Sequence, residues 1–304
     1  MPIAIVPEGL AGTRADAGAA RLFGIARSRI EEAAGRDGLL LDGVVVAKSE
    51  RLRAGATLEV SIEEPRTVEF RPQVVEGLGI VYDDADLVVV DKPAGIASHP
   101  SLGWDGGSVL EHLVAAGFRI AASGPEERKG IVSRLDVGTS GLMVVAKSEL
   151  AYTRLKQAFS ERSVRKVYHA LVQGYPAPDA GTIDAPIAHA RSDEWKMAVD
   201  PGGRPSVTHY ALIETVPGAS LLEVHLETGR THQIRVHMAA IRHPCVGDLL
   251  YGADPVLAAD LGLTRQWLHA VELGFRHPRS GDQMVFASTY PADLENSLDQ
   301  LRRS

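Results

Sequence analysis

Residues 131–147 contain a short polar loop that runs directly into an apolar segment. Arg134 and Asp136 stand two residues apart in the loop, and Gly138 and Gly141 follow them. Glycine permits backbone angles that other residues resist, and the β-branched run after it is typical of a buried strand. A carboxylate fixed at the end of a buried strand is a candidate catalytic group. From this loop alone the simpler interpretation is favoured, in which Asp136 caps the turn or pairs with Arg134.

The composition of the chain limits what kind of protein it is. Its 304 residues are enough for one large domain and a small one, and 45% hydrophobic and 23% charged residues are ordinary for a globular protein. We expect neither a signal peptide at the N-terminus nor a membrane-spanning segment. The single cysteine, Cys245, excludes an internal disulfide and a zinc site built from several thiolates, and it predicts a reducing, cytoplasmic location.

The formal net charge of the chain is −7, which argues against a generally basic nucleic-acid-binding protein. Two local clusters nevertheless concentrate positive charge. The first comprises Arg154, Lys156, Arg162, Arg165 and Lys166, and the second comprises Arg230, Arg235 and Arg242 with His232, His237 and His243. Such clusters can contact phosphates while the rest of the surface stays acidic. The alternative interpretation of each cluster is a solvated helix face.

Residues 13–63 have the pattern of a small separate unit. Two helices and three strands are predicted, at 14–21, 28–35, 38–41, 44–46 and 56–62. Ser28 is the predicted N-cap of the second helix, and Asp42-Gly43 predicts a hairpin turn. This order of elements resembles the S4-like RNA-binding domain. The resemblance implies that Arg27 and Arg29, with Lys48, contact RNA phosphates.

The pattern changes after residue 63. Pro65, Pro72, Gly77 and Gly79 predict a linker over 64–79, and residues 80–304 are predicted to form one large domain. Its predicted elements are a hairpin at 80–90, helices at 108–117 and 148–159, strands at 164–172 and 221–227, and a helix that runs to 241. Ser148 is the predicted N-cap of the helix at 148–159, and Thr231 is that of the last one.

Two of these elements carry side chains suited to chemistry. Alternation along the first predicted strand places Lys166 and Tyr168 on one face, where the alternative for Tyr168 is a core tyrosine with a hydrogen-bond partner. The turn at 228–230 precedes a helix N-terminus, which favours a bound anion. His232 and His237 are five residues apart and do not share a helix face, so no metal site is predicted there.

Several short motifs occur in a fixed order along the chain. They are Lys92-Pro93, Arg134-Leu135-Asp136 followed by Gly138-Thr139-Ser140-Gly141-Leu142, Lys166-x-Tyr168, residues 227–237, residues 243–252, Leu268-His269-Ala270 and His277-Pro278. Over residues 14–301 this set resembles the RluA-type pseudouridine synthases, in particular members with an N-terminal S4-like domain. Ser133 departs from the family pattern, because it stands where the family has histidine. The departure concerns an RNA contact rather than the nucleophile.

The resemblance implies an α+β protein with a small N-terminal S4-like α/β domain and a large catalytic domain. The catalytic domain is expected to be built on a mixed, mainly antiparallel β-sheet with flanking helices. Such enzymes isomerise uridine to pseudouridine, most often in large-subunit ribosomal RNA, without a cofactor or a metal. The implied partner is structured RNA, bound by a monomer in the cytoplasm. The alternative functions are a non-catalytic RNA-binding assembly factor of the same fold and a hydrolase that releases the base.

The resemblance also implies roles for single residues. Asp136 would be the nucleophile, and Arg235 would pair with it and keep it ionised. Tyr168 would contact the base and abstract the proton that is released late in the reaction. Arg134 would fill the gap that the flipped nucleotide leaves in its stack. The remaining expected RNA contacts are Lys92, Lys166, Arg230, His232, Gln233, Arg27 and Arg29.

Overall fold

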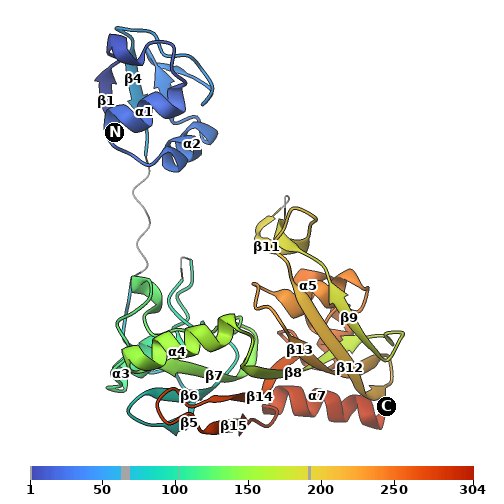
Figure 1. The fold of residues 1–304 in the computed structure, drawn as a ribbon. Helices are drawn as coiled ribbons and strands as arrows, with labels where there is room; N and C mark the ends of the chain where they lie inside the picture. The colour runs from blue at the N-terminus through green and yellow to red at the C-terminus, as the bar shows by residue number, and fades with distance from the viewer. Residues whose placement is uncertain (1, 63–68, 102, 191–192) are drawn as a thin grey trace. The chain divides into compact units, whose positions relative to one another are not determined.

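The computed structural model describes residues 2–62, 69–101, 103–190 and 193–304 (Figure 1). The chain divides into two compact units, Met1–Thr67 and Val68–Ser304. The predicted linker at 64–79 falls partly outside the described residues, since 64–68 are not among them. None of the helices in the described parts has the length and apolar character needed to cross a membrane.

The first unit is a four-stranded antiparallel sheet with two helices. In chain order its elements are β1 (Ile3–Ile5), a 3-10 turn (Glu8–Leu10), α1 (Ala15–Phe23), α2 (Arg27–Gly35), β2 (Leu39–Leu41), β3 (Val44–Val45) and β4 (Thr57–Val60). The strand order is β1-β4-β2-β3. The unit therefore begins before residue 13, because β1 pairs with β4 at its edge. Buried apolar side chains from the helices and the sheet, among them Ala19, Ile30 and Leu58, form its core.

Two local predictions for the first unit have different outcomes. The hairpin turn between β2 and β3 is confirmed: Asp42 and Gly43 have φ values of 53° and 76°, the left-handed angles that a two-residue turn requires. The predicted N-cap is wrong, because α2 begins at Arg27 and Ala26 occupies the cap position. Ser28 therefore lies inside the first turn of the helix. The S4-like assignment of this unit stays a prediction.

The second unit is built on a nine-stranded sheet of order β5-β6-β7-β14-β8-β13-β12-β9, with β15 paired to β14. The strands are β5 (Gly79–Asp83), β6 (Leu87–Lys92), β7 (Ser140–Ala146), β8 (Arg165–Gln173), β9 (Ala180–Asp184), β12 (Val207–Val216), β13 (Ala219–Leu226), β14 (Leu268–Arg276) and β15 (Gln283–Ala287). The β7–β14 pair is parallel and the other pairs in this sheet are antiparallel. The predicted mixed, mainly antiparallel sheet is confirmed.

Helices flank this sheet, as predicted for an α+β protein. They are α3 (Val109–Ala115), a 3-10 turn (Glu126–Arg128), α4 (Glu149–Ser160), α5 (Gln233–Ala240), the 3-10 turn η3 (Leu249–Tyr251), α6 (Pro255–Asp260) and α7 (Ala292–Arg303). A separate ribbon of β10 (Ile187–Ala190) and β11 (Asp193–Val199) was not predicted. Ser148 caps α4 as predicted, since its side chain accepts from the Ala151 amide. Thr231 does not cap α5, because His232 occupies that position.

Strands β6 and β7 are covered on both faces, although β6 is only one strand from the edge of the sheet. Residues 87–90 are wholly buried, so this part of β6 is a continuous apolar run rather than an alternating one. Val88 and Val90 pack in one core with residues of α3 and α5. Leu87 and Val89 pack in a second core with residues of α4. Successive residues of one strand thus hold helices on opposite faces of the sheet.

The parallel junction between β7 and β14 positions the loop that carries Asp136. The two strands pair at Ser140 and Gly141. Gly141 has φ of 112°, and a Cβ atom at this position would lie 2.3 Å from the carbonyl oxygen of Ala270. Only glycine allows this close approach, as the sequence pattern predicted for a shaped turn. The loop that ends at Ser140 is therefore fixed against the middle of the sheet.

Candidate active site

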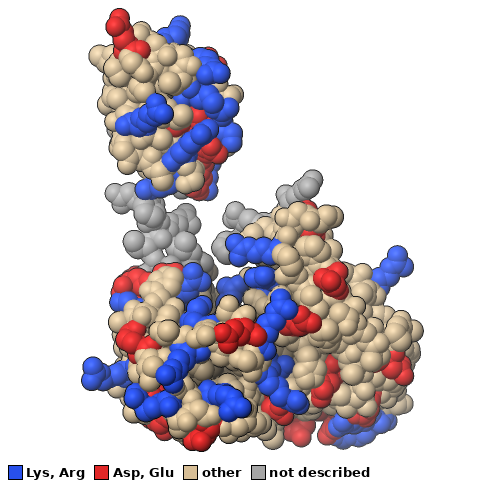
Figure 2. Space-filling view, in the orientation of Figure 1, with Lys and Arg blue, Asp and Glu red and all other residues tan. Residues whose placement is uncertain are grey.

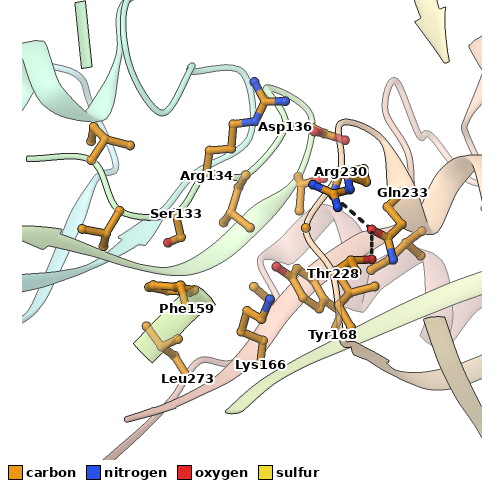
Figure 3. A pocket seen from close by; sticks show the side chains of 18 of the residues that line it. Ser133, Arg134, Asp136, Phe159, Lys166, Tyr168, Thr228, Arg230, Gln233 and Leu273 are labelled. Atoms are coloured by element: carbon orange, nitrogen blue, oxygen red, sulfur yellow. Dashed lines mark hydrogen bonds between the residues drawn. The ribbon is translucent and has the colours of Figure 1, made fainter. Parts of the chain in front are cut away.

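A cavity of about 720 Å³ opens where the 131–136 loop, β8, β14 and the start of α5 meet (Figure 3). These segments are far apart in sequence but adjacent in the fold. Eight of the residues predicted for the site line this cavity: Asp136, Tyr168, Arg235, Arg134, Lys166, Arg230, His232 and Gln233. Ser133 lines it as well. Lys92 is not part of the lining, and Arg27 and Arg29 belong to the first unit.

Asp136 lies at the lip of the sheet with its side chain 20% exposed. Its backbone carbonyl accepts from the Thr139 amide, which closes the turn before β7. Its carboxylate faces Arg235, with 3.4 Å between Oδ2 and Nη1. The distance is long for a charge-assisted hydrogen bond, so the carboxylate is oriented by Arg235 without being fully occupied by it. The predicted pair is thus brought together in the cavity.

The second acidic partner of Arg235 is Asp248, which lies within the motif at residues 243–252 and for which no role was predicted. Arg235 Nε lies 2.6 Å from Oδ2 of Asp248, and Nη2 lies 2.9 Å from Oδ1. Both side chains are buried. Burial alone would lower the pKa of Arg235, but the hydrogen bonds and charge of Asp248, with the charge of Asp136, raise it above its ordinary value. Arg235 is therefore a permanently charged group in a fixed orientation.

Tyr168 is placed by β8 so that its hydroxyl is directed into the cavity (Figure 3). Only 9% of the residue is exposed, and the hydroxyl has no hydrogen-bond partner within the described part of the chain. A core tyrosine would have such a partner. Burial, and then the charge of Asp136, raise the pKa of Tyr168 above its ordinary value. The side chain is thus a neutral phenol in the same cavity as the carboxylate.

Lys92 requires a correction, because the structure contradicts its predicted contact with RNA. The side chain is completely buried. Its ammonium donates to the carbonyl oxygens of Pro93 and Ile96, both at 2.9 Å, and to that of Val137 at 3.3 Å. Burial lowers the pKa of Lys92 to about 7. Lys92 therefore links Val137, the residue after Asp136, to the end of β6 through hydrogen bonds inside the protein.

Gln233 also has a structural role that the sequence did not indicate. Its amide nitrogen donates to the Val207 carbonyl at 2.9 Å and to the Thr208 hydroxyl at 3.0 Å. Its amide oxygen accepts from the Thr228 hydroxyl at 2.8 Å and from the Arg230 amide at 3.0 Å (Figure 3). The side chain is buried and its polar atoms are occupied. It holds the turn between β13 and α5 in place instead of contacting RNA.

The lining of the cavity is basic although the chain as a whole is acidic. Its lysine and arginine residues are Arg128, Arg134, Lys156, Arg162, Lys166, Arg230 and Arg235, whereas its carboxylates are Asp136, Glu227 and Glu272. Figure 2 shows basic side chains gathered over α4 and beside the hollow next to it. Lys166 has no acidic partner among the described residues; its ammonium lies 5.8 Å from the centre of the Phe159 ring. Local positive charge of this kind attracts phosphates.

A buried carboxylate also organises arginines in the first unit. Asp16 is fully buried and lies 2.9 Å from both Arg14 and Arg27, whose side chains are 39% and 52% exposed. The hydrogen bond from Arg14, and then that from Arg27, hold the pKa of Asp16 well below its usual range despite burial. Arg29 is exposed on the same helix as Arg27. The predicted basic residues of this unit are thus at its surface.

Comparisons with known proteins agree with this geometry. The model of the RNA pseudouridylate synthase family matches residues 86–240. An uncharacterized RNA pseudouridine synthase of Mycobacterium bovis is 57% identical over 298 residues, which cover 98% of this chain and 97% of the relative. The ribosomal large subunit pseudouridine synthase D of Xanthomonas campestris is 41% identical, over 98% of this chain and 92% of that protein.

Solved structures of similar fold agree with these sequence comparisons. Human RNA pseudouridylate synthase domain containing 1 has a TM-score of 0.58 and 28% identity, over 79% of this chain and 96% of that one. Human RNA pseudouridylate synthase domain containing 4 has a TM-score of 0.58 and 26% identity, over 74% of this chain and 93% of that one. The likeness to proteins of this name therefore extends from the sequence to the fold. The chain belongs to the RNA pseudouridylate synthase family, as its RluA-type motifs predicted.

Proposed function

We propose that this enzyme isomerises uridine to pseudouridine in large-subunit ribosomal RNA, with Asp136 as the nucleophile. The family membership makes the chain an RNA pseudouridine synthase, an isomerase. The ribosomal target is supported by relatives named ribosomal large subunit pseudouridine synthase D, which are 38–41% identical over 98% of this chain. The observation that carries the catalytic assignment is the carboxylate of Asp136, oriented by a buried arginine inside a basic cavity.

The other carboxylates of the cavity are engaged in ion pairs, which supports Asp136 as the nucleophile. Glu227 accepts from Arg162 at 2.6 Å and also contacts a histidine, and its side chain is 39% exposed. Glu272 is paired with Arg165 at the surface end of β8. Among the residues that the structure describes in this lining, Asp136 is the least exposed carboxylate, and it shares the cavity with the phenol of Tyr168.

A single carboxylate is enough for the proposed reaction. The bond from N1 of uracil to C1′ of ribose breaks, and a bond from C5 to C1′ forms, so no oxidant or reductant is consumed. Glycoside hydrolases need a second carboxyl group to protonate a poor leaving group. Uracil leaves as a delocalised anion and does not need one, while a carboxylate nucleophile can hold the reacting carbon between the two steps.

Arg235 and Tyr168 have complementary roles in the proposed mechanism. Arg235 is charged and fixed by Asp248, so it orients the nucleophile and favours its ionised form. The phenol of Tyr168 is available to contact the base. In the proposed last step the C5–C1′ bond has already formed and released the carboxylate of Asp136; Tyr168 then takes the proton from C5, and N1 gains a proton, so that the product has the composition of uridine.

The side chains proposed to contact RNA are basic or polar groups of the cavity and of the surface of the first unit. Arg134, Lys166, Arg230 and His232 line the cavity and are proposed to bind the target nucleotide and its phosphates. Arg27 and Arg29 of the first unit are proposed to bind flanking RNA, in keeping with its predicted S4-like character. The proposal places the enzyme in the cytoplasm with its ribosomal substrate; the monomeric state stays a prediction.

Mapping of pseudouridine in cellular RNA tests this function. Large-subunit RNA from cells that lack the protein would be compared with RNA from cells that carry the wild-type chain or Asp136→Asn. We expect defined pseudouridines to appear only with the wild-type chain. Pseudouridine that appears with Asp136→Asn would contradict the nucleophile. RNA binding by the wild-type chain without any modification would favour the non-catalytic assembly factor, and release of free uracil would favour a hydrolase.

A further inference from the structure

A histidine of the cavity, His232, is held in an uncommon backbone conformation. Its φ is 55°, in the left-handed region that residues other than glycine rarely adopt, and it forms the N-cap of α5 without a side-chain cap. Its Nδ1 atom lies 2.8 Å from the hydroxyl oxygen of Tyr251 at the end of η3. The two rings meet edge to face, with centroids 5.7 Å apart. The imidazole is thus fixed from its Nδ1 side.

The hydroxyl of Tyr251 has a second partner that determines where its proton goes. The backbone amide of Met197, in β11, donates to the hydroxyl oxygen at 3.0 Å. Tyr251 is 8% exposed, and Nδ1 of His232 is the other polar partner that the described residues offer to this hydroxyl. If Nδ1 carried a hydrogen, the buried phenolic proton would have no acceptor, which is costly. The phenol therefore donates to Nδ1.

A neutral imidazole whose Nδ1 accepts a hydrogen bond carries its proton on Nε2. Burial lowers the pKa of His232, which favours this neutral form at pH 7. Within the described residues Nε2 has no protein partner, and His232 lines the same cavity as Asp136. The Nε2–H group is consequently a hydrogen-bond donor that is directed by the protein and left open for a ligand.

We propose that Tyr251 is a positioning residue that sets the tautomer of His232, so that Nε2–H donates a hydrogen bond to an oxygen of the target nucleotide. The proposal rests on the proposed function, because it takes uridine in RNA as the ligand. Tyr251 also lies beneath Arg235, whose guanidinium carbon is 4.9 Å from the centre of the tyrosine ring. One side chain thus supports two residues of the cavity: its ring lies against Arg235, and its hydroxyl bonds His232.

The substitution Tyr251→Phe separates these two contributions, because it removes the hydroxyl and keeps the ring under Arg235. The matched control is Tyr290→Phe, which removes a hydroxyl that bonds Nδ1 of His169 away from the cavity. The first readout is the tautomer of His232 in the RNA-free, full-length protein at pH 7.5, read from two-bond nitrogen–proton couplings after labelling histidine with ¹⁵N. The spectrum of His232→Gln identifies the signals that belong to His232.

We expect the Nε2–H tautomer for His232 in the wild-type chain and in Tyr290→Phe, and a mixture of tautomers in Tyr251→Phe. An Nδ1–H tautomer in the wild-type chain, or a His232 signal unchanged by Tyr251→Phe, would overturn the proposal. This measurement needs neither RNA nor turnover, so its result is independent of whether the proposed function is correct.

The second readout is turnover on a large-subunit RNA fragment. Tyr251→Phe should lower kcat/KM about tenfold, which corresponds to one hydrogen bond. The double variant with His232→Ala should lose little more than Tyr251→Phe alone. His232→Gln, whose amide can donate from a similar position, should recover part of the activity lost in His232→Ala. Additive losses or no recovery would contradict the proposed donor. RNA fragments in which sulfur replaces O2 or O4 of the target uracil, or a phosphate oxygen of the target nucleotide, identify the accepting oxygen. It is the oxygen whose replacement makes wild-type and His232→Ala enzymes equally active.

Discussion

In each of the two units a buried carboxylate forms an ion pair with arginine, but the arginines differ in exposure. In the second unit Asp248 and Arg235 are both buried, with side chains 2% and 8% exposed. In the first unit Asp16 is buried, but Arg14 and Arg27 are 39% and 52% exposed. The buried Arg235 also contacts Asp136 in the cavity, whereas Arg14 and Arg27 are open to solvent. We propose that exposure, rather than the ion pair, distinguishes an arginine that orients the nucleophile from one that binds RNA.

A large loss of rate is expected from a change in the tyrosine of the cavity. Tyr168→Phe keeps the ring but removes the hydroxyl that is proposed to take the C5 proton in the cavity of Asp136, so we expect kcat to fall on the order of 100- to 10,000-fold while RNA affinity stays unchanged. Single-turnover kinetics and filter binding on one RNA fragment measure both quantities. Tyr210→Phe, which removes a hydroxyl bonded to a backbone carbonyl outside the lining, is the control. A loss of affinity with normal kcat would make Tyr168 a packing or binding residue.

The next effect concerns the buried carboxylate of the second unit. Asp248→Asn leaves Arg235 without its two charge-assisted bonds, and we expect kcat to fall roughly 10- to 100-fold with little change in RNA affinity. The control is Asp254→Asn, at an exposed helix cap. Turnover and thermal unfolding should be measured together on the full chain. If Asp248→Asn lowered RNA affinity and left kcat intact, Arg235 would be a binding residue like those of the first unit.

Asp16→Asn is the corresponding change in the first unit, and it should have a smaller effect, on RNA affinity instead of on kcat. Loss of the carboxylate releases Arg14 and Arg27, so we expect RNA affinity to decrease, and the slope of log affinity against log salt to decrease by about one per lost phosphate contact. The rate of the bound complex should not change. Salt titrations of RNA binding measure the slope. A lower single-turnover rate at saturating RNA would break the distinction between the two units.

Acid should also distinguish the units, because every histidine of the chain lies in the second one. Burial lowers the pKa of His269 to about 4 from its ordinary 6.5. Between these values the unfolded chain binds a proton that the folded unit does not, so stability is complete above pH 6.5 and is lost as the pH falls towards 4. At pH 5 this costs the second unit about 2 kcal/mol. The pKa of Asp16 lies far below pH 5, so its ion pairs persist there.

Urea unfolding followed by tryptophan fluorescence measures this difference, since Trp104, Trp195 and Trp267 all belong to the second unit. The midpoint should be lower at pH 5 than at pH 7, and His269→Gln should reduce the shift between the two. Hydrogen exchange of the first unit should change less over the same range. Equal midpoints at the two pH values would contradict the role of buried neutral histidine.

The sequence predicted the elements whose patterns are local. The hairpin at Asp42-Gly43, the Ser148 cap and the alternation that places Lys166 and Tyr168 together depend on residues a few positions apart. The order of motifs predicted the family and the mixed sheet. The parallel pairing of β7 with β14 could not be predicted, because it joins residues separated by more than a hundred positions.

The errors about RNA contacts have one physical cause, which is that polarity does not indicate exposure, whereas the two wrong N-caps are shifts of a helix start by a residue or two. Lys92 and Gln233 were predicted to contact RNA because they are polar residues in motifs, yet both are buried and their polar atoms have partners within the protein. Asp248 was quoted in a motif without a role, because its partner Arg235 lies on another element. Tyr251 was overlooked for the same reason. Burial and pairing of polar groups arise from the whole fold, and a motif does not contain them.

The central claim is that Asp136 performs the chemistry and does not merely hold RNA. The most direct test measures turnover and affinity of purified full-length Asp136→Asn on the same large-subunit RNA fragment, with tritium release from C5 of uridine as the readout. Asp260→Asn, at an exposed helix end, is the matched control. The account predicts that Asp136→Asn loses on the order of 10⁴-fold or more in rate with RNA affinity retained. Near-normal tritium release by Asp136→Asn would contradict it.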